Sequence, residues 1–146
     1  MQFQILIYNN AEFVAALEDG LMEELDRTHA AVIAQLEATG ELVSSEELSP
    51  EVALTVRTDP ADGKRVRVTD GPFSESKEWV GGFYTVDVGS IDRAVEIAGR
   101  FVEARYSPIE VRLVGRPATG EAEAVAVAVA VAVAVADVPG RTGHSA

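Results

Sequence analysis

Two residues in the first 115 have the types and positions that proton transfer requires. His29 is the only histidine in this part of the chain, and it lies on the apolar stripe of an expected helix. Asp70 ends an expected strand just before a Gly-Pro turn. An imidazole that faces a cleft beside a carboxylate can exchange a proton with a ligand, as general acid–base catalysis requires. The first hypothesis is therefore a catalytic His29–Asp70 pair, with Tyr84 or Glu78 as the alternative partner of His29.

Each of these residues also has an ordinary structural explanation. A single histidine on an apolar helix face is often a hydrogen-bonded core residue, and an Asp before Gly commonly caps a turn. Aromatic side chains nearby could line a ligand pocket or pack in the core, and for Phe83 we favour packing. Paired glycines inside a strand predict a β-bulge or the close approach of a ligand or another backbone. The candidate substrate-binding residues are Phe73, Trp79, Gly81, Gly82 and Tyr84.

Composition argues against several other kinds of chemistry. The chain has no cysteine, which excludes disulfides, thiolate metal sites and a cysteine nucleophile. With one histidine in the domain and acidic residues such as Glu23, Glu24 and Asp26 on a solvated helix face, we expect no metal site. No dinucleotide, P-loop or serine-hydrolase motif occurs, so we expect no tightly bound cofactor. A net charge of −12 opposes binding to nucleic acid.

Hydrophobic periodicity predicts the elements that would position these residues. An amphipathic helix is expected over residues 21–38, ended by Gly40, and Ser90 begins a second helix over residues 91–104. Alternating apolar residues predict strands over 1–8, 53–58, 65–70, 80–88 and 109–115, with a weaker one over 41–48. The order is that of an α+β, ferredoxin-like βαββαβ fold, with an antiparallel sheet, both helices on one face and an added hairpin.

The composition changes near Gly115. Every Trp, Tyr and Phe lies within residues 1–115, whereas a strict Val-Ala alternation fills residues 124–136. We therefore expect one domain over 1–115 and a tail over 116–146 that lies outside the core and holds no site residue, His144 included. The alternation favours an extended tail, and the helix propensity of alanine supports a short helix as the alternative.

The chain start and the sheet pattern bear on location and partners. The first residues lack the features of a signal peptide, and no apolar run reaches the roughly 20 residues of a membrane span. We expect a soluble, cytoplasmic protein without membrane contact. Apolar side chains occupy both faces of the strand over residues 83–88, so we also expect a homodimer that buries the second face of the sheet.

The segment TDGPFSESKEWVGGFYTVDV, residues 69–88, resembles the signature of the YCII-related, DGPF-type family. Matching blocks elsewhere are the strand ending in Tyr8, the His29-Ala30 pair and EVRLV from Glu110. The resemblance covers about residues 1–115 and implies a bacterial protein that forms a dimeric α+β barrel. It also implies a functional link to an extracytoplasmic-function sigma factor, whose gene often lies near those of the family. Relatives are regarded as enzymes because a His and an Asp face a cleft.

Three functions remain open at this point. The first is a small-molecule enzyme of the isomerase, lyase or hydrolase type, in which His29 and Asp70 transfer a proton. The second is a metabolite-binding module without turnover. The third is a dimeric interaction protein beside a sigma factor, whose acidic surface meets a basic partner. A cleft that holds His29 and Asp70 would favour the first two, and an exposed apolar patch rimmed by acids would favour the third.

Overall fold

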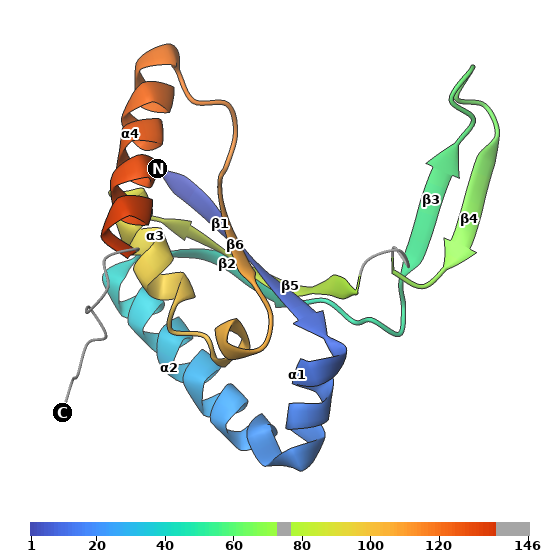
Figure 1. Cartoon of the computed structure of the whole chain (residues 1–146), viewed down its shortest axis with the longest axis horizontal. Helices are drawn as coiled ribbons and strands as arrows, with labels where there is room; N and C mark the ends of the chain where they lie inside the picture. The colour runs from blue at the N-terminus through green and yellow to red at the C-terminus, as the bar shows by residue number, and fades with distance from the viewer. Residues whose placement is uncertain (73–76, 137–146) are drawn as a thin grey trace.

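The protein has the predicted α+β, ferredoxin-like architecture (Figure 1). The computed structural model describes residues 1–72 and 77–136. A four-stranded antiparallel sheet has the order β2-β5-β1-β6. Its strands are β1 (Gln2–Asn10), β2 (Leu42–Glu47), β5 (Glu78–Asp87) and β6 (Ile109–Leu113). The sheet does not close into a barrel within one chain, because β2 and β6 lie at its two edges.

Two helices cover one face of this sheet. They are α2 (Met22–Thr39), which ends at Gly40 in the left-handed conformation as predicted, and α3 (Ile91–Ala98), which Ser90 caps. Before α2, the chain forms a short helix α1 (Ala11–Ala16) and a π-helical turn η1 (Leu17–Leu21), neither of which the periodicity predicted. The side chain of Asn10 accepts a hydrogen bond from the Phe13 amide and so begins α1 directly at the end of β1.

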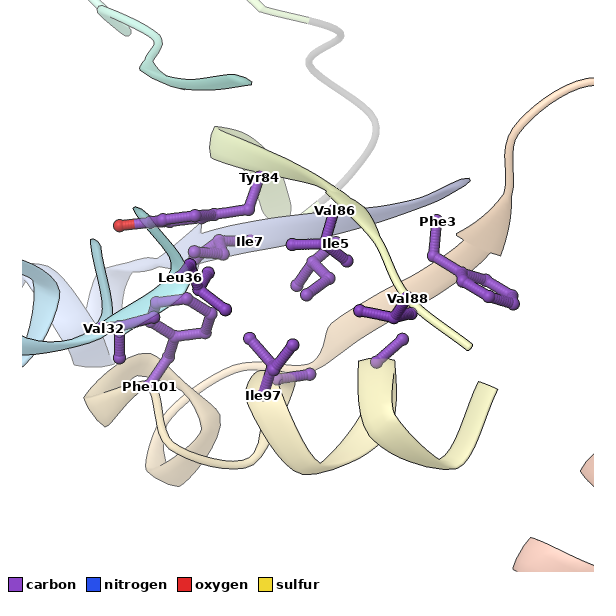
Figure 2. Packing of buried hydrophobic residues seen from close by; sticks show 12 residues of the cluster. Phe3, Ile5, Ile7, Val32, Leu36, Tyr84, Val86, Val88, Ile97 and Phe101 are labelled. Atoms are coloured by element: carbon purple, nitrogen blue, oxygen red, sulfur yellow. The ribbon is translucent and has the colours of Figure 1, made fainter. Parts of the chain in front are cut away.

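The core follows the alternation of the two central strands. Phe3, Ile5 and Ile7 of β1 point toward the helices, as do the buried residues of β5 and its C-terminal end. Val32, Leu36 and Ile97 meet them from α2 and α3 (Figure 2). Burial on one face fixes the strand register, because a slip of one residue would turn every apolar side chain to the other face.

The paired glycines of β5 form the predicted bulge. Gly82 pairs with Ile7 and Val80 pairs with Tyr8, so Gly81 is an extra residue in the ladder. A Cβ atom at Gly82 would lie 2.9 Å from the backbone oxygen of Glu46 in β2. Glycine at this position therefore lets β2 approach the central strands closely.

The predicted hairpin forms outside the main sheet. Strands β3 (Leu54–Thr58) and β4 (Val66–Asp70) pair only with each other, and the hairpin extends away from the helices and the four-stranded sheet (Figure 1). Its turn uses the expected chemistry, since Asp59 and Asp62 each accept a hydrogen bond from a backbone amide two residues further on.

The tail is helical, so the extended conformation that the alternation favoured is wrong. Helix α4 (Thr119–Ala136) lies beside α3 (Figure 1). Its partly buried positions, Ala122, Val125 and Ala128, recur every third residue on one helix face. A helix satisfies its own backbone hydrogen bonds, whereas an extended segment would need a strand partner. The placement of residues 116–146 outside the core remains a prediction, and His144 lies outside the described residues.

Within the described ranges, no helix combines the length and apolar character that crossing a bilayer requires.

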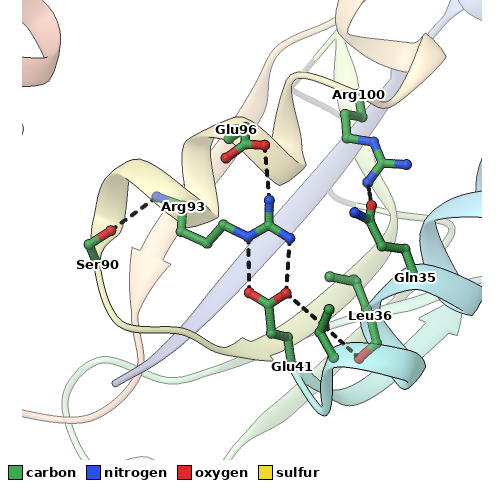
Figure 3. A network of polar contacts seen from close by, with 8 residues as sticks. Gln35, Leu36, Glu41, Ser90, Arg93, Glu96 and Arg100 are labelled. Carbon is green, nitrogen blue, oxygen red and sulfur yellow. Dashed lines mark hydrogen bonds and ion pairs between the residues drawn. The ribbon is translucent and has the colours of Figure 1, made fainter.

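A polar clamp joins the end of α2 to α3 (Figure 3). The Arg93 guanidinium donates from Nε and Nη2 to the two carboxylate oxygens of Glu41, and each of these two hydrogen bonds is 2.9 Å long. Its Nη1 donates to Glu96. These hydrogen bonds from Arg93, with a further one from Thr39, lower the pKa of Glu41 from 4.5 to about 2. The clamp fixes the point at which the chain leaves α2 and enters β2.

We expect Glu41→Gln to lower the free energy of unfolding at pH 7 by about 1–2 kcal/mol, because the pair is bidentate but partly solvated. The pKa of Glu41 is depressed in the folded state. The stabilisation is therefore fully present above pH 4.5 and should disappear as the pH falls toward about 2. Urea unfolding of both proteins between pH 7 and pH 3 measures this difference. Glu37→Gln, an exposed change on α2, is the matched control, and an equal loss in that variant would argue against the clamp.

Candidate functional site

A cavity of about 550 Å³ opens where the N-terminal half of α2 faces the ends of β1, β2 and β5. One wall is apolar and comes mainly from β1, α1, η1 and α2: Ile7, Phe13, Leu17, Met22, Leu25 and Ile33. Ala30, Gly81, Gly82 and Phe83 also line the cavity. Its polar lining residues are Asn9, Asp26, His29, Ser45, Glu46, Glu47, Tyr84 and Glu103. A concave site that joins an apolar wall to a few convergent polar groups is typical of small-molecule binding.

Three polar side chains of this cavity form a continuous chain. The Tyr84 hydroxyl lies 2.7 Å from His29 Nδ1, and His29 Nε2 lies 2.7 Å from Glu103 Oε1. Each residue comes from a different element: Tyr84 from β5, His29 from α2 and Glu103 from the 3₁₀ turn η2 (Val102–Arg105). Both ring nitrogens of His29 are thus engaged, which fixes the orientation of the imidazole.

Ring packing holds the same three residues in place. The Phe101 ring lies 5.0 Å from the His29 ring and 4.7 Å from the Tyr84 ring, measured between centroids. Tyr84 is itself part of the hydrophobic core, and Figure 2 shows its ring among the apolar side chains. The hydroxyl of Tyr84 therefore cannot swing away from His29 without disturbing the core.

Glu103 is a charged group in an apolar setting. Its side chain is only 6% exposed, and its second oxygen, Oε2, is buried without a hydrogen-bond partner among the described residues. A buried carboxylate is costly unless hydrogen bonds or a cation compensate it. A carboxylate oxygen only accepts, so the geometry assigns the Nε2–H of His29 as the donor to Glu103 Oε1, and the Nδ1 of a neutral imidazole as the acceptor from the Tyr84 hydroxyl.

The environment of Tyr84 keeps its phenol protonated. Burial raises the pKa of Tyr84 above its ordinary value of 10.0. A hydrogen bond with Ser45 opposes this rise, and the negative charge of Glu103 adds to it. Tyr84 is thus suited to donate a proton, or to pass one on, and not to hold a phenolate.

Sequence comparisons identify the family. The model of the YCII-related domain matches residues 1–116. The chain belongs to the YCII-related family. It is also 33% identical over 123 residues to an uncharacterised protein of Rhizobium meliloti (strain 1021), covering 83% of this chain and 98% of that protein.

In this YCII-related protein, the predicted His29–Asp70 contact does not form within the chain. Asp70 is exposed at the end of β4, opposite Leu54 on the projecting hairpin, and it does not line the cavity. The partner of His29 that we gave as the alternative, Tyr84, does contact it, and Glu103 takes the position of the carboxylate. The physical reason is that the hairpin pairs only with itself and extends away from α2 (Figure 1).

The candidate substrate-binding residues fall into three groups. Gly81, Gly82 and Tyr84 line the cavity. Trp79 pairs with Asn9 in the sheet but is not a lining residue, and its indole N–H is buried without a partner among the described residues. Phe73 lies outside the described residues.

Sequence reasoning missed Glu103 and Asn9. Asn9 packs over the bulge, and a Cβ atom at Gly81 would collide with its side chain. The bulge was predicted, but it was not predicted that the side chain of Asn9 would lie against the glycine at its centre. Across the described residues, no group of three or more His, Cys, Asp or Glu side chains is arranged to hold a metal ion.

The tautomer of His29 can be observed directly. Long-range ¹H–¹⁵N spectra at neutral pH should show Nε2 protonated and Nδ1 as a hydrogen-bonded acceptor. Tyr84→Phe keeps the ring packing but removes the donor, so the Nδ1 resonance should move toward that of an unbonded acceptor. Tyr106→Phe is the matched control and should leave the His29 signals in place. An Nδ1-protonated imidazole in the wild-type protein would contradict the assigned geometry.

Proposed function

We propose that the cavity is the site of an acid–base reaction on a small molecule, in which a proton passes between the ligand and His29 through Tyr84. The observation that carries this proposal is the chain from Tyr84 through His29 to Glu103, with both contacts at 2.7 Å. It replaces the His29–Asp70 pair of the sequence-based hypothesis.

The relay balances without a free phenolate. When a ligand transfers a proton to the Tyr84 oxygen, the phenolic proton moves to His29 Nδ1 and the imidazole becomes an imidazolium. Glu103 stabilises that cation through Nε2–H, and the reverse sequence returns the proton to the ligand. The raised pKa of Tyr84 fits this role, because the phenol is neutral before and after the transfer. Isomerases, lyases and hydrolases share such a step.

An uncharged aromatic probe tests the relay. Removal of one carbon-bound proton from 5-nitrobenzisoxazole breaks its N–O bond and releases a coloured cyanophenolate, so absorbance reports proton abstraction. We expect His29→Asn to lower kcat/KM for this probe at least about tenfold, since a positioned base commonly contributes ~10²–10⁴-fold. Glu103→Gln should lower it less, because the imidazolium loses its stabilising charge but the base remains.

Two control variants complete this test. His144→Asn removes the other histidine of the chain and should leave the rate unchanged. Asp70→Asn separates the relay from the earlier hypothesis and should also have no effect. Equal rates in wild-type and His29→Asn proteins, with both folded by circular dichroism, would refute the proposal.

A second role, as a self-associating protein, is favoured by the projecting hairpin. Leu54, Val56, Val66 and Val68 share one face of it and are each between 58% and 68% exposed. An isolated two-stranded hairpin is marginally stable in water, so cover for this face would stabilise it. Residues 54–70 carry four basic and three acidic side chains, whereas the whole chain carries 12 and 24. We propose that the hairpin packs against the acidic body of a second copy.

Light scattering at micromolar concentration should then give about twice 15.5 kDa for the wild-type protein. Replacing Val56 and Val68 together by Thr keeps β propensity but removes apolar contact, and it should shift the protein toward the monomer. The matched control replaces Val127 and Val131, two exposed valines of α4, by Thr and should leave the mass unchanged. A folded wild-type monomer, or loss of the dimer in the α4 variant alone, would contradict this interface.

A further inference from the structure

The charged side chains that line the cavity are almost all acidic. Four carboxylates lie along it, those of Asp26, Glu46, Glu47 and Glu103, and no described lining residue is Lys or Arg. His29 is the only basic group among them, and its charge when protonated would offset just one carboxylate. The polar part of the cavity therefore has a negative potential that disfavours anionic ligands and favours cations.

The carboxylates occupy two levels of the site. Asp26, Glu46 and Glu47 are exposed, whereas Glu103 is buried and has one oxygen without a hydrogen-bond partner among the described residues. Charges exposed to water attract a ligand only weakly because the solvent screens them. The buried carboxylate acts through a medium of lower dielectric, so its attraction for a cation is stronger and more local.

The opposite, apolar wall of the cavity favours an apolar group in the rest of the ligand. Six apolar side chains form it, and three of them, Leu17, Leu25 and Ile33, are partly buried. An apolar group of the ligand would gain free energy by leaving water on this wall. The cavity is large enough for a molecule of drug-like size, since such sites range from ~300 to 1,000 Å³.

We infer that the cavity binds small amphipathic amines, with an apolar body on the α1–α2 wall and a protonated amine directed toward the Glu103 carboxylate. This deepens the proposed function by naming the class of ligand, and it rests on that function for the choice of this cavity as the site. The amine would compensate the buried charge of Glu103 in the same way that His29 Nε2–H does at the other oxygen.

Three probes with the same phenylethyl body separate the effects of charge and shape. They are 2-phenylethylamine, 2-phenylethanol and 3-phenylpropionate, titrated at pH 7 and followed by the amide ¹H–¹⁵N spectra of the full chain. We expect the amine to bind at least about tenfold more tightly than the carboxylate, a difference of ~1.4 kcal/mol, with the alcohol between them. Raising the salt concentration should reduce this preference only in part, because the dominant carboxylate is buried.

Glu103→Gln keeps the shape of the side chain and removes its charge. In this variant the affinity for the amine should fall to that for the alcohol, while the affinity for the alcohol stays the same. Glu37→Gln removes an exposed carboxylate of α2 that does not line the cavity and serves as the matched control. If Glu103→Gln fails to fold, the order of the three probes in the wild-type protein decides the matter. Equal or tighter binding of the carboxylate, or no binding of any probe, overturns the inference.

His29→Asn distinguishes this inference from the proposed function. The variant should lose proton abstraction from 5-nitrobenzisoxazole but keep its preference for the amine, because Glu103 stays charged. If the protein prefers the amine but shows no turnover that depends on His29, the proposed reaction is refuted and the inferred ligand class stands. If turnover depends on His29 but the protein does not prefer the amine, the ligand class is refuted and the proposed reaction stands.

Discussion

The arrangement of this site depends on one carboxylate that the fold removes from water. Glu103 is 5% exposed, and a charge so placed destabilises the folded chain unless N–H groups reach it. His29 supplies such a group from α2, and Tyr84 on β5 fixes the other side of the imidazole. The turn η2, helix α2 and strand β5 therefore meet at a hydrogen-bonded chain within an otherwise apolar core. The geometry of the candidate site is thus tied to the one hydrogen bond that this buried carboxylate receives from His29.

The parts of the fold that could be predicted from the sequence are those in which a local pattern and its burial coincide. Phe3, Ile5 and Ile7 alternate because β1 has one covered face, and the same period placed β5 correctly. The helical stripe likewise placed His29 toward the sheet. The Val-Ala tail shows the limit of this reasoning, because a period of two describes side chains only. It does not say whether the backbone has a strand partner, and α4 forms as a helix that needs none.

Glu103 was missed, and Asp70 was paired with His29, for reasons that lie beyond local pattern. In a continuous helix over 91–104, Glu103 would share the solvent face of Glu96, which lies two turns earlier. The helix instead ends at Ala98, and the chain then forms the separate 3₁₀ turn η2, in which the side chain of Glu103 is buried. Asp70 stands at the end of a correctly predicted strand, but the direction in which a hairpin extends from the body depends on tertiary contacts. The strand or helix that contains a residue can thus be predicted correctly while the residues that it contacts in space remain unknown.

Tyr84 belongs to the hydrophobic core and to the polar chain at once, with its ring on Phe101 and its hydroxyl on His29. This double membership limits how the protein can change over evolutionary time. A substitution that puts a different polar group at this position also removes the packing of the aromatic ring, whereas the exposed positions of α4 and of the hairpin turn can vary at little cost to the cavity. Under the proposed function, new specificities would therefore arise more readily on the α1–α2 wall, whose side chains line the cavity but are not part of the hydrogen-bonded chain.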